Sequence, residues 1–161
     1  MSKRGFATTL WFDENRAEEA VDFYLSVFKD SSRGRTLHYN DAGPGPAGSV
    51  VTVEFELNGQ RFIALNGGPE FKFSEAVSFQ IDCADQAEVD HYWARLTEGG
   101  GQERPCGWLK DRFGVSWQVV PEQLIDLIAD PDGARATRAT KAMYAMKKID
   151  LETVRKAHAG E

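Results

Sequence analysis

Two glutamates in one apolar stretch are the acidic side chains best placed for catalysis. The segment 50–57 alternates apolar residues with Thr52, Glu54 and Glu56. Because successive side chains of a strand point to opposite faces of a sheet, both glutamates would lie opposite the apolar residues. A carboxylate that a cleft shields from water holds its proton more readily and can act as a general base. Glu54 is therefore the candidate catalytic residue, although an exposed strand glutamate without a chemical role would give the same pattern.

Neutral polar side chains with one indole form a second candidate set, suited to binding. The predicted ligand-binding residues are Trp11, Asn66, Ser78, Gln80 and Gln118. Amides and hydroxyls donate and accept hydrogen bonds without adding charge, and an indole can stack on a flat ring. This set suits an uncharged aromatic or quinone-like molecule held in a cleft. The alternative is that the same face is simply solvated, as one face of many antiparallel sheets is.

The remaining reactive residue types give no pattern of their own. Cys106 has no basic neighbour in the sequence that would activate it, which favours a buried structural thiol over a reactive one. His38, His91 and His158 lack the spacing of metal ligands. A Gly-x-Ser-x-Gly elbow and a phosphate-binding loop are also missing from the sequence. We therefore expect no metal and no cofactor.

The elements that must position these residues occur in the same order twice. The first set is a strand, a helix that begins near Asn15, and three strands, with Asn58-Gly59 as a two-residue hairpin turn. Its predicted strands are 6–12, 35–39, 50–57 and 61–66. The second set has a helix that begins at Asp85 and ends at three glycines. Its predicted strands are 76–82, 102–105, 107–110 and 115–120.

This order predicts an α+β fold of two βαβββ modules, about 6–66 and 76–121, in one domain over 1–121. If the mixed sheet curves, its polar face becomes the cleft. We assign the helix-covered apolar face to Leu10, Phe12, Ile63, Leu65, Phe79, Ile81, Trp117 and Val119. The opposite face is assigned to Thr9, Trp11, Ala64, Asn66, Ser78, Gln80, Ser116 and Gln118.

Residues 122–161 are predicted to form a helical C-terminal extension packed on that domain. Helices are expected over 122–129, from Asp130 to Met146, and after Asp150. The residues that would suit helix packing are Ala139, Ala142, Met143 and Met146. They could face a second copy of the chain, which is part of our reason to expect a homodimer, or the helix could fold back on its own domain.

Composition excludes several classes of partner. The 161-residue chain has a formal net charge of −6, which argues against a nucleic-acid surface. Apolar runs stay well below the roughly 20 residues that span a membrane, so no membrane partner is expected. The two cysteines form no Cys-x-x-Cys pair and no signal-like segment is evident, so we expect a cytoplasmic protein.

Several of these segments resemble one superfamily. Leu10-Trp11-Phe12 before a helix and the strand 113–118 are similar to the vicinal oxygen chelate superfamily, which includes glyoxalase I, extradiol dioxygenases and bleomycin-resistance proteins. Leu65-Asn66-Gly67-Gly68-Pro69 and Cys106-Gly107-Trp108 resemble its PhnB-like group, often labelled 3-demethylubiquinone-9 3-methyltransferase. The resemblance implies the glyoxalase-like fold and runs from about Phe6 to Pro121.

The resemblance also implies where a metal would be bound. The superfamily's ligand positions fall near Thr9 (or Thr8), Ala64, Ser78 and Gln118, where this chain has no strong donor to a divalent cation. The methyltransferase label likewise lacks its usual Gly-rich strand-to-helix turn, since Gly99-Gly100-Gly101 follows a helix. We therefore predict a metal-free binder of a small, largely uncharged aromatic or quinone-like molecule. One alternative is an enzyme of the superfamily that uses Glu54 with an unrecognised cofactor or metal; it would be methyltransferase-labelled or lyase- or dioxygenase-like. Another alternative is a module that serves mainly for dimerisation.

Overall fold

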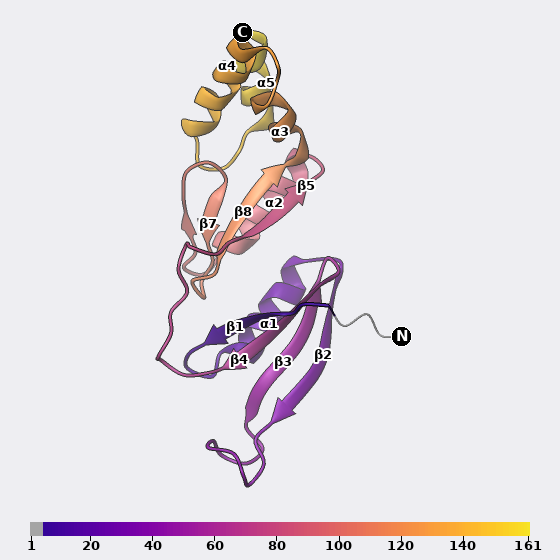
Figure 1. Ribbon diagram of the computed structural model, residues 1–161, viewed down its shortest axis with the longest axis vertical. Coiled ribbons are helices and arrows are strands. Elements are labelled where there is room, and N and C mark those ends of the chain that lie inside the picture. Colours follow the sequence, from indigo (N-terminus) through magenta and orange to yellow (C-terminus); the bar gives the residue numbers. More distant parts are fainter. Residues whose placement is uncertain (1–4) are drawn as a thin grey trace. The chain divides into compact units, whose positions relative to one another are not determined.

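Each half of the chain forms its own sheet covered by a helix (Figure 1). The structure is a computed structural model, and residues 5–161 are described. The chain divides into two compact units, Met1–Phe73 and Ser74–Glu161, and each is described by itself.

The first unit has the predicted order of one strand, one helix and three strands. The elements are β1 (Thr8–Phe12), α1 (Ala17–Val27), β2 (Ser31–His38), β3 (Val50–Leu57) and β4 (Gln60–Asn66). The strands lie in the order β1-β4-β3-β2, with β1 parallel to β4 and the other pairs antiparallel. Asn58 and Gly59 both have positive φ, 48° and 80°, which is the backbone of a two-residue hairpin turn.

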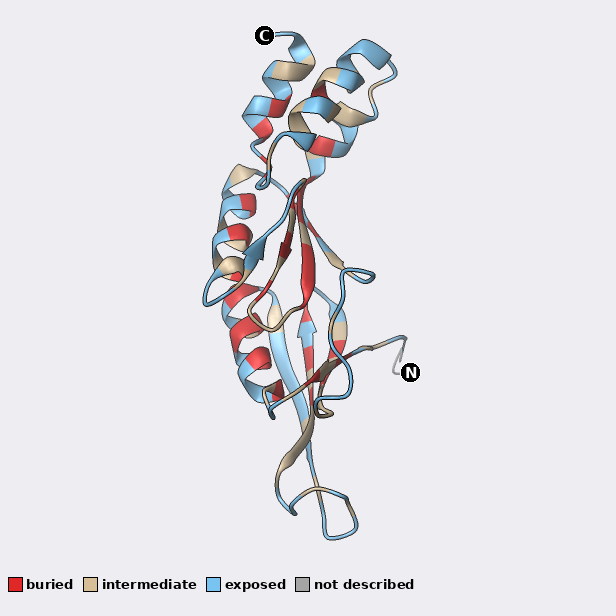
Figure 2. Cartoon of the chain, turned by 90° about the vertical axis from the view of Figure 1, so that its left-hand side faces the viewer, coloured by how far each residue is buried: buried red, intermediate tan, exposed pale blue. Residues whose placement is uncertain are grey.

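Helix α1 buries one face against this sheet. Ala17, Ala20, Val21 and Tyr24 are each 0% exposed, as their helical spacing predicts. The Tyr24 ring stacks on Phe55 of β3 with centroids 6.0 Å apart. Figure 2 shows the buried residues along one side of the helix.

The face predicted for β4 is wrong. The register pairs Leu10 with Ala64 and Phe12 with Asn66, so both β4 residues share the buried face of β1. Ile63 and Leu65 lie on the opposite face with Trp11. Residues 62–65 are all apolar, so alternation along this strand could not decide its inner face, and pairing with β1 decides it instead.

The second unit repeats the order. Its elements are β5 (Phe79–Cys83), α2 (Gln86–Thr97), β6 (Gln102–Glu103), β7 (Trp108–Lys110) and β8 (Ser116–Pro121). The strands lie in the order β5-β8-β7-β6, with β5 parallel to β8. At the start of α2, Asp85 Oδ1 accepts from the Glu88 backbone N–H at 2.9 Å and Glu88 Oε2 accepts from Ala84 N–H at 2.9 Å. Two βαβββ modules with mixed sheets confirm the predicted α+β fold.

A buried carboxylate organises the turn between β7 and β8. Asp111 is 3% exposed, which is unusual for an aspartate in a turn. Its Oδ1 accepts from the Phe113 and Val115 backbone N–H groups at 2.9 and 3.0 Å. Its Oδ2 accepts from the indole Nε1 of Trp117 at 2.9 Å. One side chain therefore fixes the turn and the start of β8.

Three helices complete the second unit. They are α3 (Glu122–Ile128), α4 (Gly133–Tyr144) and α5 (Leu151–Ala159). Val120, Leu124, Ala139, Ile149 and Val154 form their shared core. Helix α4 thus packs on its own unit through Ala139, with Met143 partly buried against the same core. None of the helices within residues 5–161 has both the length and the apolar character of a membrane span.

Candidate functional site

A pocket of about 430 Å³ lies in the second unit, between the sheet and the C-terminal helices. The strands contribute Gln80, Trp108, Gln118 and Val120, and the loop before β7 contributes Pro105 and Cys106. The helices contribute Leu124, Ile125, Ile128, Met143 and Tyr144. Its volume lies in the range of small-molecule sites, which are mostly apolar with a few placed polar groups.

Gln80, Gln118 and Trp108 lie side by side on three neighbouring strands. The register pairs Gln80 with Gln118 and Trp108 with Gln118, so all three side chains share one face of the sheet. The alternation predicted for β5 and β8 matches this register, because Phe79 pairs with Trp117 on the other face. We call Gln80, Gln118 and Trp108 the floor of the pocket.

The hydrogen bonds of the two glutamines determine what the floor offers a ligand. Gln118 Nε2 donates to Ser78 Oγ at 2.9 Å, and Gln80 Nε2 donates to Asp82 Oδ1 at 2.7 Å. A carboxylate only accepts, so the Gln80 amide is oriented with its oxygen away from Asp82. In the described part of the chain neither glutamine Oε1 has a hydrogen-bond partner. The floor therefore presents two acceptor oxygens, and the Gln118 amide can turn because a serine hydroxyl also donates.

The loop that carries Cys106 is held by the C-terminal segment. The Cys106 and Gly107 backbone N–H groups donate to the carbonyls of Met146 and Lys147 at 3.0 and 2.7 Å. Gly107 has a φ of 81°, and a Cβ there would lie 2.9 Å from the Val119 carbonyl oxygen, so only glycine fits. Cys106 is half-buried at the edge of the pocket, a more accessible position than the structural thiol that the sequence favoured.

Cys83 is the contrasting thiol of the same unit. It is 0% exposed on β5. Burial, followed by the nearby Glu88 and Asp82 carboxylates, raises the pKa of the Cys83 thiol to about 12. This thiol therefore stays protonated and unreactive near neutral pH.

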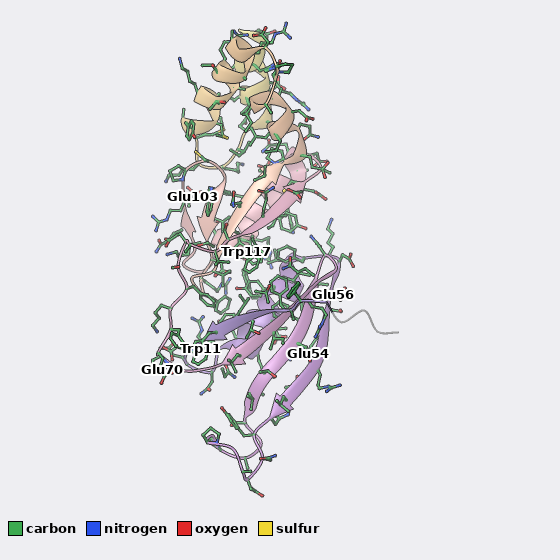
Figure 3. The ribbon with its side chains drawn as sticks, in the orientation of Figure 1. Trp11, Glu54, Glu56, Glu70, Glu103 and Trp117 are labelled. Carbon is green, nitrogen blue, oxygen red and sulfur yellow. The ribbon has the colours of Figure 1, made fainter. Side chains whose placement is uncertain are left out.

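Trp11 lies in the first unit, where the chain after β4 holds its ring. Its Nε1 donates to the Gly68 carbonyl at 2.8 Å. The Phe71 ring meets it edge-on, with centroids 4.9 Å apart. A Cβ on Gly67 would lie 2.1 Å from the indole, so the backbone packs directly against the ring. The half-buried indole is thus fixed in place (Figure 3).

Asn66 has a structural position, and its assignment to the cleft face is corrected by the β4 register. Its Oδ1 accepts from the Ala17 backbone N–H at 2.9 Å, at the start of α1. Its Nδ2 donates to the Val50 carbonyl at 3.1 Å. The side chain therefore ties β4 to α1 and β3, a role that local sequence patterns do not reveal because both partners are distant in the chain.

Glu54 lies on the face of the first sheet that faces away from α1, because Val53 and Phe55 are the buried residues beside it. Its side chain is half-buried, whereas Glu56 is exposed; both are labelled in Figure 3. Within residues 5–161 the Glu54 carboxylate has no hydrogen-bond or ion-pair partner.

The positions where the superfamily would hold a metal do not fit one in this chain. Ala64 is 0% exposed and offers no donor atom, and Thr9 provides only a neutral hydroxyl. The Ser78 hydroxyl is hydrogen-bonded to Gln118. In the part of the chain that the structure describes, no three His, Cys, Asp or Glu side chains group so that they could hold a metal ion.

The helical side of the pocket is what the sequence reasoning missed. Trp108 was read only as part of a strand and a family motif, although it lies opposite Gln118. The sequence carried no local signal for it, and only the structure shows that Ile125 of α3 and Tyr144 of α4 are 51% and 68% exposed. An amphipathic helix normally keeps such residues on its buried face.

Comparison with known proteins identifies relatives of the first 120 residues. A family model described as 3-demethylubiquinone-9 3-methyltransferase matches residues 4–120. A PhnB protein from Bacillus cereus, provisionally described as a 3-demethylubiquinone-9 3-methyltransferase, is 32% identical; the match covers 73% of this chain and 99% of that one, with a TM-score of 0.65. No curated protein matches.

More distant solved structures share the fold. The protein PA1353 from Pseudomonas aeruginosa is 21% identical over 73% of this chain and 96% of its own, with a TM-score of 0.60. The fosfomycin resistance protein FosX from Listeria monocytogenes is 16% identical over 75% of this chain and 93% of its own, with a TM-score of 0.50. These two matches show that the fold is shared. The chain belongs to the 3-demethylubiquinone-9 3-methyltransferase family, the PhnB-like group of the vicinal oxygen chelate superfamily.

Proposed function

We propose that this protein binds a small, largely uncharged aromatic or quinone-like molecule in the pocket of the second unit, without a metal ion. The observation that carries the proposal is the floor, where Gln80, Gln118 and Trp108 share one face of the sheet in an open, partly apolar pocket of about 430 Å³. Ser78 contributes by holding the Gln118 amide. Trp11 lies in the first unit and is not part of this pocket, so its binding role stays a separate prediction, whereas Asn66 is left out because its amide is bonded within the fold.

The neutrality of the ligand follows from the chemistry of the floor. A charge taken out of water needs an opposite charge or several strong hydrogen bonds, and amides with an indole supply neither a counter-charge nor a dense set of donors. The open Gln80 oxygen suits a hydroxyl or N–H of the ligand. The Gln118 amide, which can turn on Ser78, suits either a hydroxyl or a carbonyl.

Titration with 2-naphthol, an uncharged aromatic with one hydroxyl, tests the proposal. We expect saturable binding by isothermal titration calorimetry. Gln118→Leu should weaken it about 3- to 10-fold, the value of one neutral hydrogen bond. Gln60→Leu, an exposed glutamine in the first unit, is the matched control and should leave affinity unchanged. Absence of saturable binding, or equal loss in both variants, would refute the proposed site.

The metal-free character has its own test. Zinc, nickel, manganese and iron(II) salts are added separately, and the melting temperature is followed by differential scanning fluorimetry. We expect no saturable stabilisation, because binding to the folded state alone would raise the melting temperature. A saturable shift with one of these ions contradicts this part of the proposal.

A second candidate function is an enzyme that uses Glu54 with an unrecognised cofactor or metal. What favours it is a half-buried carboxylate without a partner within residues 5–161. Glu54→Gln should leave 2-naphthol affinity unchanged if the protein only binds its ligand. The homodimer also stays a prediction, and light scattering at micromolar concentration decides between the 17.9 kDa monomer and twice that mass.

A further inference from the structure

The apolar side of the pocket comes from helices that the family match does not reach. The family model ends at residue 120 and the Bacillus cereus relative matches 73% of this chain, while α3 begins at Glu122. We infer that α3 and α4 form a specificity-determining wall, which makes this site prefer fused-ring or similarly extended aromatic molecules over single rings. The inference rests on the proposed function.

The wall is defined by five residues that line the pocket from the helices. They are Leu124, Ile125, Ile128, Met143 and Tyr144. Apart from the Tyr144 hydroxyl their side chains are apolar, whereas the two amides of the pocket come from the strands. A ligand would therefore turn its polar edge to the floor and its apolar body to the wall. The wall extends over two helices, so a single ring would cover only part of it.

The wall is held firmly enough to select shape. Leu124 is 3% exposed in the core shared by the helices and β8. Gln86 of α2 accepts from the Leu151 backbone N–H at 2.9 Å and donates to the Ile149 carbonyl at 3.0 Å. Together with the bonds from the Cys106 loop to Met146 and Lys147, these contacts attach residues 146–151, which follow α4, to α2 and to the loop before β7. A preformed wall discriminates between ligands better than one that must be ordered on binding.

Ile125 and Tyr144 can be shortened with little disturbance of the core, since they are 51% and 68% exposed. The double variant Ile125→Ala, Tyr144→Ala is therefore compared with wild type for 2-naphthol and for phenol. We expect wild type to bind 2-naphthol at least about 10-fold more tightly than phenol, because the second ring buries additional apolar surface. In the double variant this ratio should fall to about 3-fold or less, mainly through weaker 2-naphthol binding.

The control is the double variant Phe6→Ala, Leu37→Ala, which removes an aromatic and an aliphatic side chain that are 103% and 53% exposed in the first unit. This control variant should keep the wild-type ratio of 2-naphthol affinity to phenol affinity. An unchanged ratio in the wall variant, with binding intact, would overturn the inference and leave the proposed function standing.

Thiol labelling tests the wall without any ligand. Cys106 lies in the pocket, and Cys83, 0% exposed, is the internal control. In wild type, the wall should bind the fused rings of N-(1-pyrenyl)maleimide beside Cys106, so this reagent should label Cys106 faster than N-ethylmaleimide does. In the wall variant the ratio of the two labelling rates should fall at least 3-fold. The ratio of labelling rates could fall as expected in the wall variant although neither 2-naphthol nor phenol binds wild type. In that case the wall is supported and the proposed ligand class fails. If the ratio of the two labelling rates is the same in wild type and in the wall variant, the result counts against the wall.

Discussion

Replacing Asp111 with alanine should destabilise the second unit more than any surface change in the chain. The substitution deprives three donors of their acceptor, the backbone N–H groups of Phe113 and Val115 and the indole Nε1 of Trp117. Val115 and Trp117 are 2% and 3% exposed, so water does not replace the lost oxygen at these two donors. A buried donor left unpaired costs about 1–3 kcal/mol. The substitution also removes the free-energy cost of burying the Asp111 charge, which offsets part of this loss. We expect a net loss of about 3 kcal/mol in the free energy of unfolding.

Urea unfolding followed by circular dichroism measures this loss. Asp111→Asn keeps the size of the side chain and one oxygen, but places an NH₂ group against the donors, so it should cost about 2 kcal/mol. Asp41→Ala, an exposed loop aspartate, is the control and should stay within about 0.5 kcal/mol of wild type. A loss below about 1 kcal/mol for Asp111→Ala would refute the view that this carboxylate holds the turn.

Three further outcomes follow from named contacts. Asn66→Ala should lower the unfolding free energy by about 1–2 kcal/mol, because the Ala17 backbone N–H loses its acceptor. Calorimetry should show unchanged 2-naphthol affinity. A loss of affinity would contradict the purely structural role of Asn66. Asp150→Ala should cost about 1 kcal/mol at pH 7 by removing the cap of α5. The hydrogen bond from the Thr153 backbone lowers the pKa of Asp150, so its contribution is present above about pH 4 and is lost as the pH falls through the lowered pKa. The urea midpoints of the two proteins should therefore approach each other as the pH is lowered below about 4, and a constant gap would contradict this. Glu54→Gln should leave 2-naphthol affinity within twofold of wild type by calorimetry, because the pocket belongs to the second unit, and a larger change would contradict that location.

Local signals in the sequence predicted most of the fold. Asn58-Gly59 is a hairpin turn with both residues at positive φ, and Asp85 caps α2 as its spacing with Glu88 predicts. Alternation placed Gln80 and Gln118 on one face correctly, because Phe79, Ile81, Trp117 and Val119 alternate with polar residues there. These features depend on residues a few positions apart, which is where sequence patterns are informative.

Features that depend on distant pairing escaped prediction. The inner face of β4 is set by its register with β1, some 50 residues earlier, since 62–65 are uniformly apolar. The Asn66 side chain bonds to the backbone of Ala17, which lies in another element far away in the chain. The wall could not be foreseen because nothing in the spacing of α3 and α4 says which side of the sheet they cover.

The floor and the wall come from separate stretches of the polypeptide, since the strands end at Pro121 and the wall begins at Leu124. Hydrogen-bonding preference and shape preference can therefore be altered one at a time. Substitutions at Ile125, Ile128 or Tyr144 would change which ligand shapes the pocket prefers. Gln80 and Gln118 would still offer the same hydrogen-bonding groups. A small library restricted to these helix positions would make the chain a scaffold for graded aromatic selectivity.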